Sequence, residues 1–162
     1  MDTKKIMLIA AVIVVALCLT AFFVFLFPQS FFPAPDEVII YSGGQSVKLK
    51  GRDAAACIRM LDKYVDKDSQ THAALFIMQE NIARLEETET CIELIYYKPI
   101  TLEIKAHWEN VQRLFIQLSD DDGGASGLVF YAKDDVYQPG PWLAFNEAGV
   151  NALLSRIPAL ID

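Results

Sequence analysis

Cys91 and His107 are the two residues of this chain whose types could make a nucleophile and its base. A catalytic cysteine needs a cationic neighbour that holds it as the thiolate. Cys91 stands instead beside Glu89 and Glu93, and negative neighbours raise the pKa of a thiol. His72 and His107 lie far apart in sequence, and no HxxxH or CxxC spacing indicates zinc. We therefore expect no catalytic residues, no metal site and no cofactor.

Cys57 and Cys91 could alternatively form a disulfide, which would close a long loop and stabilise the fold. Cys57 falls on the side of a predicted helix that faces the core. Cys91 falls on the side of a predicted strand that faces solvent. These opposite positions predict that the two thiols are not bonded to each other, and cysteine is also an ordinary small buried residue.

The acidic and glycine-rich loops do not match known ion or phosphate sites. In the loop that begins at Asp120, Ala125 stands where an EF-hand needs glycine and Tyr131 stands where it needs glutamate. The glycines of YSGG, DGGASG and QPGP lack the Walker spacing and the strand–glycine–helix context of a dinucleotide site. We interpret them as turns.

The segment VYQPGPWLAF is the best candidate for an interaction site. Tyr137 and Trp142 flank a stiff turn that contains Pro139 and Pro141. Aromatic side chains on a rigid loop can anchor a protein or a sugar ring. The alternative is that Trp142 packs into the core beneath the last helix, with Tyr137 beside it.

Local patterns predict the elements of the first half of the domain. Residues 38–41 and 46–50 are β-rich runs joined by SGGQ, which predicts a hairpin. Residues 51–68 place an apolar residue every three or four positions, which predicts a helix with Asp53 at its positive end. A second helix is predicted over 72–87. The predicted core-facing residues of the two helices are Ala54, Cys57, Ile58, Leu61, Val65, Leu75, Met78, Ile82 and Leu85.

After Glu89 the apolar period changes to two, which is typical of strands. Residues 91–105 predict two strands around a turn at Lys98 and Pro99. Ile92, Leu94 and Tyr96 share the core face of the first strand, whereas Cys91, Glu93, Glu103 and Lys105 are expected on the solvent face. Residues 113–119 and 127–133 predict two more strands, followed by an irregular segment.

The last helix has a complete start signal. Asn146 is a favoured N-cap, Glu147 suits the first turn, and Phe145 and Val150 stand at the positions of a hydrophobic staple. Pro158 is expected to end the helix. The predicted class is therefore α+β: an N-terminal hairpin and a four-strand antiparallel meander packed with two or three helices, over residues 37–162.

A 22-residue run without charge or proline, from Ile6 to Phe27, precedes this domain. As a helix it would extend about 33 Å, enough to cross a bilayer core of about 30 Å. A retained transmembrane anchor at 6–27 is predicted, with membrane lipid as its partner, a tip at 1–5 and a linker at 28–36. We expect Phe31 and Phe32 at the membrane interface.

Two other outcomes are open for this run. Cleavage as a signal peptide would place Leu19 where small residues are preferred, and lipidation at Cys18 would follow Leu17 where a small residue is normal. Lys4 and Lys5 precede the run and no cation follows it before Glu37. By the positive-inside tendency, the N-terminus is cytoplasmic and the domain is extracytoplasmic at the cell membrane.

The formal net charge of the chain is −7 at pH 7. Since an acidic surface repels phosphate backbones, no nucleic-acid partner is expected. The layout of lysines, span, PDEVIIYSGGQSVKLKG and GLVFY…GPW resembles small, uncharacterised, single-pass anchored proteins of Gram-positive bacteria. That resemblance implies an outward-facing domain of unknown function and carries over no functional residue.

Two classes of function remain. The first is a non-enzymatic, membrane-anchored extracytoplasmic module that binds a protein or an envelope glycan. The alternative is a cell-surface hydrolase or thiol enzyme whose site the sequence does not reveal.

Overall fold

The computed structural model of the chain describes residues 12–16, 18, 30–66, 79–102, 108–119, 125–138 and 143–161. The chain divides into two compact units, Met1–Ser30 and Phe31–Asp162. Of the described residues of the first unit, 12–16 and 18 are helical. Within the described ranges no helix is both long and apolar enough to cross a membrane. The prediction of a transmembrane helix as part of the fold is therefore wrong, and the rest of residues 6–27 lies outside the described residues.

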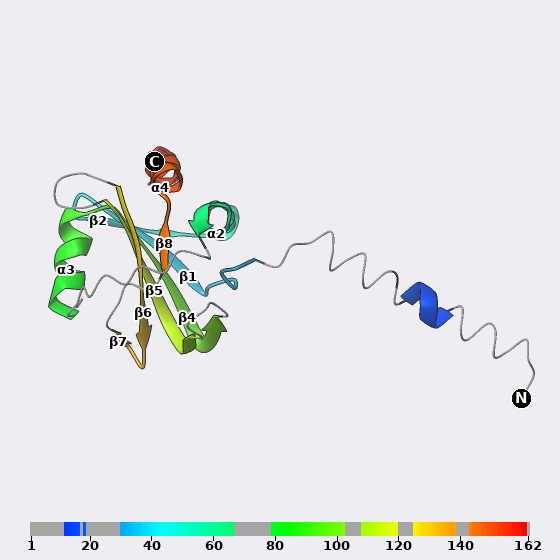
Figure 1. Cartoon of the computed structure of the whole chain (residues 1–162). Helices are drawn as coiled ribbons and strands as arrows, with labels where there is room; N and C mark the ends of the chain where they lie inside the picture. The colour runs from blue at the N-terminus through cyan, green and yellow to red at the C-terminus, as the bar shows by residue number, and fades with distance from the viewer. Residues whose placement is uncertain are drawn as a thin grey trace, which may run out of the picture. The chain divides into compact units, whose positions relative to one another are not determined.

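The second unit is built on one antiparallel sheet, which confirms the α+β prediction (Figure 1). In the described part of the chain its strands follow the order β2-β1-β4-β5-β6-β8-β3, and β7 pairs with β6 beside this path. The strands are β1 (Glu37–Ser42), β2 (Gln45–Leu49), β3 (Val65–Asp66), β4 (Cys91–Leu102), β5 (Trp108–Ser119), β6 (Ala125–Lys133), β7 (Val136–Tyr137) and β8 (Leu143–Phe145).

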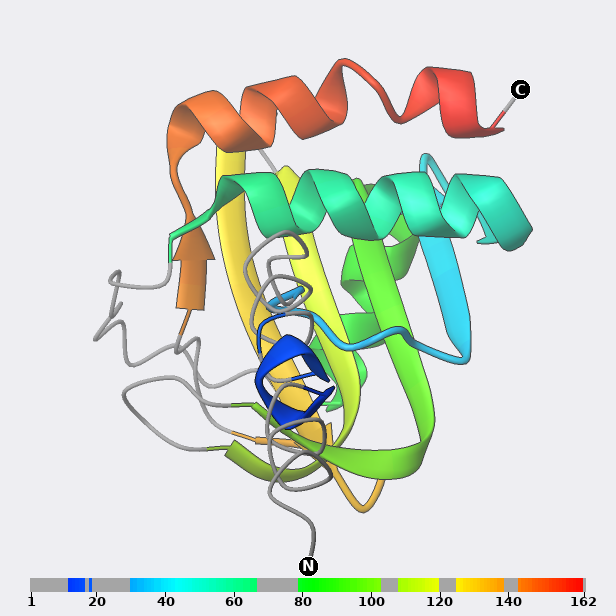
Figure 2. The same ribbon diagram turned by 90° about the vertical axis from the view of Figure 1, so that its right-hand side faces the viewer.

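Helices cover both faces of this sheet. Figure 1 shows α3 (Gln79–Thr88) on one side and α2 (Gly51–Tyr64) and α4 (Glu147–Leu154) on the other. In Figure 2, α2 runs across the strands, and α4 with α5 (Pro158–Ile161) runs beside it. The sheet is therefore the middle layer of three.

The predicted hairpin is confirmed as β1 and β2, paired from Val38 opposite Leu49 to Ser42 opposite Gln45. Gly43 and Gly44 have φ of 57° and 75°. A two-residue turn with positive φ at both positions matches the right-handed twist of the strands, and glycine adopts it without steric cost.

The predicted face of α2 is also confirmed, since Cys57, Ile58 and Leu61 are buried. The helix ends at Tyr64, earlier than predicted, because Val65 and Asp66 pair with Phe145 and Ala144 as β3. The described part of the second helix starts at Gln79, and Ile82 and Leu85 are buried as predicted. Residues 67–78 lie outside the described residues.

The predicted turn at Lys98 and Pro99 is wrong, because β4 runs through both residues. The partnership of β4 with β1 ends at Ile95, and the register against β5 shifts between Ile95 and Ile100. Proline lacks the N–H that a central strand needs, and it is tolerated at edges and bulges. Because β1 no longer pairs with β4 at Pro99 and the register against β5 shifts there, the strand continues through the proline. The meander therefore consists of three long strands, β4, β5 and β6, and not of the four that were predicted.

The solvent face predicted for β4 is wrong for Cys91 and Glu93, which are 0% and 3% exposed. The core face was predicted correctly, and Ile92, Leu94 and Tyr96 belong to the larger apolar cluster with the inner face of α2. A smaller cluster lies on the other face. It contains Ile82, Leu85, Cys91, Phe115, Phe130, Ala132 and Tyr137. The alternation of apolar residues in the sequence predicts which face of β4 packs on the larger cluster. It does not predict that the opposite face is buried too, because that burial depends on α3.

Phe32 is fully buried in the larger cluster, so its expected place at a membrane interface is wrong. Its ring stacks on that of Phe145 with centroids 6.4 Å apart. Its backbone N–H donates to Oδ1 of Asp62 over 2.9 Å. These contacts attach the chain just before β1 to both α2 and β8.

The C-terminal prediction is confirmed for the start of the helix, but Pro158 does not end it, because α4 ends at Leu154 and Pro158 begins α5. The Asn146 side chain accepts a 2.7 Å hydrogen bond from the Gly149 N–H and caps α4. Phe145 and Val150 are both buried in the larger cluster. The segment predicted to be irregular contains two short strands instead, β7 and β8, which pair with β6.

Candidate functional site

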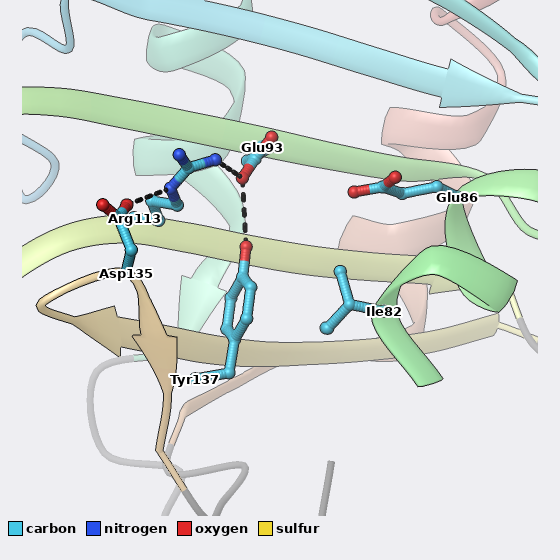
Figure 3. A pocket seen from close by; sticks show the side chains of 6 residues that line it. All are labelled: Ile82, Glu86, Glu93, Arg113, Asp135 and Tyr137. Atoms are coloured by element: carbon cyan, nitrogen blue, oxygen red, sulfur yellow. Dashed lines mark hydrogen bonds and ion pairs between the residues drawn. The ribbon is translucent and has the colours of Figure 1, made fainter. Parts of the chain in front are cut away.

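A pocket of about 190 Å³ opens between α3 and the sheet (Figure 3). It lies on the face of the sheet opposite α2. Its lining residues come from α3, β4, β5, β7 and the turn between β6 and β7, and are Ile82, Glu86, Glu93, Arg113, Asp135 and Tyr137.

Glu93 is the central polar residue of the pocket. It is 3% exposed, and its carboxylate accepts three hydrogen bonds from three neighbouring elements. The Tyr41 hydroxyl of β1 donates to Oε2 over 2.9 Å. The Tyr137 hydroxyl of β7 and a guanidinium N–H of Arg113 in β5 donate to Oε1 over 3.0 and 3.1 Å. A buried carboxylate needs such partners, because an unpaired buried charge is strongly destabilising.

Arg113 connects this buried carboxylate to the pocket rim. Its Nε–H donates to Oδ1 of Asp135 over 2.9 Å, while its terminal nitrogen contacts Glu93. Burial disfavours the charged guanidinium, but the hydrogen bonds to Asp135 and Glu93 outweigh burial and raise the pKa of Arg113. Arg113 therefore stays a cation that bridges two carboxylates (Figure 3).

The two tyrosines of the site are hydrogen-bond donors and not bases. Burial raises the pKa of both Tyr41 and Tyr137, and the adjacent charge of Glu93 raises it further. Each hydroxyl therefore keeps its proton at any physiological pH. The Tyr137 ring also packs edge-on against Phe115 at 6.1 Å, which fixes the direction of its hydroxyl.

Glu86 is the acidic residue of the pocket without a close counterion among the described residues, and Arg113 attracts it only from a longer distance. Among the described residues it makes no hydrogen bond or ion pair, and it extends from α3 toward the space beside Glu93 (Figure 3). Burial raises its pKa, the negative charges of Glu93 and Glu87 raise it further, and the positive charge of Arg113 opposes them without reversing the direction. With Glu86, Glu93 and Asp135 against Arg113, the pocket has an excess of negative charge.

A second buried carboxylate, Glu89, is part of the framework. It accepts hydrogen bonds from Ser119 over 2.9 Å and from Thr88 over 3.2 Å. Ser119 in turn accepts the Thr90 N–H over 2.9 Å. These contacts fasten the end of α3 to β5.

The cysteines are poorly placed for nucleophilic chemistry. Neither Cys57 nor Cys91 is bonded, which confirms the predicted absence of a disulfide. Burial raises the pKa of Cys57 to about 12, and burial with Glu89 and Glu86 raises that of Cys91. Within the described ranges no group of three His, Cys, Asp or Glu side chains could hold a metal. His107 and His72 lie outside the described residues.

Of the interaction site predicted from the sequence, only Tyr137 lies among the described residues. Tyr137 is 7% exposed and directs its hydroxyl into the pocket, so its ring offers little surface to a large partner. Pro139, Pro141 and Trp142 lie outside the described residues, as does the loop that begins at Asp120. Their predicted roles stay predictions.

Sequence reasoning did not find Glu86, Glu93 and Arg113 as one site. A signal was present in CIELIYY, where Glu93 interrupts an apolar strand and therefore needs a donor. The identity of that donor depends on the pairing of β4 with β5, which places Arg113 opposite Ile95, diagonal to Glu93. No known protein family, curated protein or solved structure matches this chain.

Proposed function

We propose that this domain is a non-enzymatic binding module and that the pocket beside α3 is its ligand site. The observation that supports the proposal most is Glu86, a partly buried carboxylate that makes no hydrogen bond or ion pair among the described residues and faces a carboxylate whose oxygens already accept hydrogen bonds. A fold gains nothing from such an arrangement, since like charges destabilise each other. A ligand that neutralises Glu86 would remove this cost.

The lining favours a small organic cation with an ammonium or guanidinium head. Glu86 and the second oxygen of Asp135 are available acceptors. Ile82 and Tyr137 also line the pocket, but they are 2% and 7% exposed, so its accessible lining is mainly polar. A volume of 190 Å³ is below the usual range for drug-sized ligands, roughly 300–1,000 Å³, so the bound group is small. It could also be the side chain of a lysine or arginine on a protein partner.

Catalysis is the weaker alternative. A thiol enzyme needs an accessible thiolate, whereas both described cysteines of the domain are buried and their pKa values are raised. The hydrolase alternative has no activated nucleophile in the pocket, because the tyrosines are protonated donors to Glu93. The compartment, and the classes of partner expected from the sequence, stay predictions.

Titration with n-butylammonium and n-butylguanidinium tests the proposal, with n-butyrate as the anionic control. We expect the two cations, and not butyrate, to shift the NMR signals of the Ile82, Glu86 and Tyr137 amides. Glu86→Gln should weaken binding at least tenfold. Glu87→Gln is the matched control, because Glu87 is the neighbouring exposed glutamate on α3 and is no part of the pocket. Equal effects of the two substitutions, or no cation binding at millimolar concentration, would refute the proposed site.

A further inference from the structure

The turn between β6 and β7 is held in an unfavourable backbone conformation. Asp134 and Asp135 have φ of 52° and 59°. Aspartate tolerates this left-handed region better than most residues, but glycine and asparagine are preferred in such hairpin turns. The strand that follows, β7, has two residues and pairs with β6 alone among the described strands. The hairpin therefore needs additional contacts to stay on the sheet.

Two side-chain contacts supply that attachment, and both end on one ion pair. The Tyr137 hydroxyl donates to Glu93, and the Asp135 carboxylate accepts from Arg113. Glu93 and Arg113 are themselves in contact over 3.1 Å. A third contact, from the Asp135 N–H to Oε1 of Gln112, is longer at 3.2 Å and exposed.

We propose that the β6–β7 hairpin is a strap that opens and closes over the pocket, and that the Glu93–Arg113 pair holds it closed. Both attachments lie at the pocket wall, so release of the hairpin moves Asp135 and Tyr137 away from Glu93 and widens the site. Regions that open locally often have short pairing, and β7 pairs over two residues, although the Tyr137 ring also packs in the smaller apolar cluster. The hairpin would open and close in this way whichever ligand the pocket binds.

The two attachments differ in strength. The side chains of Arg113 and Asp135 are 36% and 70% exposed, so solvent and salt weaken their attraction. The Tyr137–Glu93 bond is buried and involves a charged acceptor, which makes it the stronger contact. Loss of the Tyr137 hydroxyl should therefore release the hairpin more than loss of the Asp135 charge.

Amide hydrogen exchange of the full chain measures this opening. The reporter is the Gln138 N–H, which donates to the Tyr131 carbonyl over 2.9 Å and exchanges when β7 leaves β6. The reference is the β4 stretch from Ile92 to Ile95, which pairs with β1 and β5 on its two sides.

In the wild type we expect Gln138 to exchange at least tenfold faster than the reference and with a smaller dependence on urea concentration, and we expect Tyr137→Phe and Arg113→Gln each to speed Gln138 exchange at least tenfold. Asp135→Asn should give a smaller increase. Asp134→Asn is the matched control and should not speed exchange, because Asp134 is exposed, lies outside the pocket and has a positive φ that asparagine tolerates at least as well. Unchanged Gln138 exchange in Tyr137→Phe and Arg113→Gln would overturn the proposal. Equal exchange rates and equal urea dependence of Gln138 and the reference in the wild type would overturn it too, because the hairpin would then open only when the whole domain unfolds.

Discussion

Cys57 in α2 and Cys91 in β4 are both completely buried, but they belong to two separate apolar clusters on opposite faces of the sheet. The Cys91 thiol donates a weak 3.7 Å hydrogen bond to the Leu85 carbonyl, and no cation among the described residues lowers the pKa of either cysteine. Both side chains therefore act as packing residues.

The first prediction concerns the reactivity of these thiols. In the native protein at pH 8, a thiol reagent should leave Cys57 and Cys91 unmodified, and in denaturant it should modify both. Because the pKa values of both thiols are raised in the fold, they also make the free energy of unfolding depend on pH. Above the ordinary thiol pKa of about 9 the unfolded chain loses protons that the folded chain keeps, so the free energy of unfolding should fall with rising pH. Rapid native labelling of either cysteine would contradict this account.

The second prediction concerns the pH dependence that Glu86 causes. Its pKa is raised in the fold, so between its ordinary value of 4.5 and the raised value the folded chain binds more protons than the unfolded chain. Stability due to Glu86 should thus increase as the pH falls through the raised pKa. Glu86→Gln should stabilise the domain at pH 7 by up to about 1 kcal/mol, the upper end for exposed charges.

Urea unfolding of the wild type, Glu86→Gln and Glu87→Gln at several pH values measures this effect. The gain from Glu86→Gln should shrink as the pH approaches 4.5, and Glu87→Gln should show a smaller gain. A destabilised Glu86→Gln variant at pH 7 would indicate that the carboxylate has a stabilising partner.

The third prediction uses two glycines with the same backbone requirement and different surroundings. Gly127 and Gly51 have φ of 67° and 50°. A Cβ at Gly127 would lie 2.6 Å from Cγ2 of Val150 and 2.8 Å from the Phe145 carbonyl, whereas a Cβ at Gly51 would meet nothing within 4 Å. Gly127→Ala should cost more than about 2 kcal/mol, from overpacking added to strain. Gly51→Ala should cost about 1 kcal/mol in the same denaturation experiment, and equal losses would show that the close contact relaxes freely.

The fourth prediction tests whether the segment before β1 belongs to the folded domain. Phe32 is fully buried between α2 and β8. Phe32→Ala should lower the free energy of unfolding by about 3–5 kcal/mol, as for other buried aromatic residues. Ala34, which is exposed, provides a control through Ala34→Ser, which should have little effect. A loss below about 1 kcal/mol for Phe32→Ala would show that this segment packs only loosely.

The fifth prediction concerns the cap of α4. Asn146→Ala removes the acceptor of the Gly149 N–H and should cost about 1 kcal/mol. Asn151→Ala lies within the same helix at an exposed position and should be neutral or slightly stabilising, because alanine is the better helix former. Thermal unfolding compares the two, and an equal cost would argue against the cap.

The parts of the fold predicted correctly are those with local signals. Two glycines define the β1–β2 turn, spaced apolar residues define the buried face of α2, and Asn146 marks the start of α4. The strands β3 and β8 were missed because each is two or three residues long and exists only through its pairing. Pro99 suggested a turn because its missing N–H excludes a fully paired strand, but β4 has already lost one neighbour at that point.

The candidate site was missed for a similar reason. Tyr41, Glu93, Arg113 and Tyr137 are separated by tens of residues in sequence, and no local spacing connects them. Tyr137 was selected for its ring and its neighbouring prolines, whereas the structure uses its hydroxyl. A polar residue within an apolar strand showed that a partner was needed, and only the sheet register supplies that partner.

The position of β3 has a consequence for how the chain is synthesised. It follows α2 directly, yet it pairs with β8, at the opposite edge of the sheet from β2 (Figure 2). During synthesis Val65 cannot pair with Phe145 until β8 has left the ribosome. Until then α2 lacks part of the sheet on which it packs. A nascent chain stalled after Gln138 should remain open to protease within 51–66, whereas the completed chain should be protected there. The domain can therefore complete its sheet only once β8 is free to pair with β3.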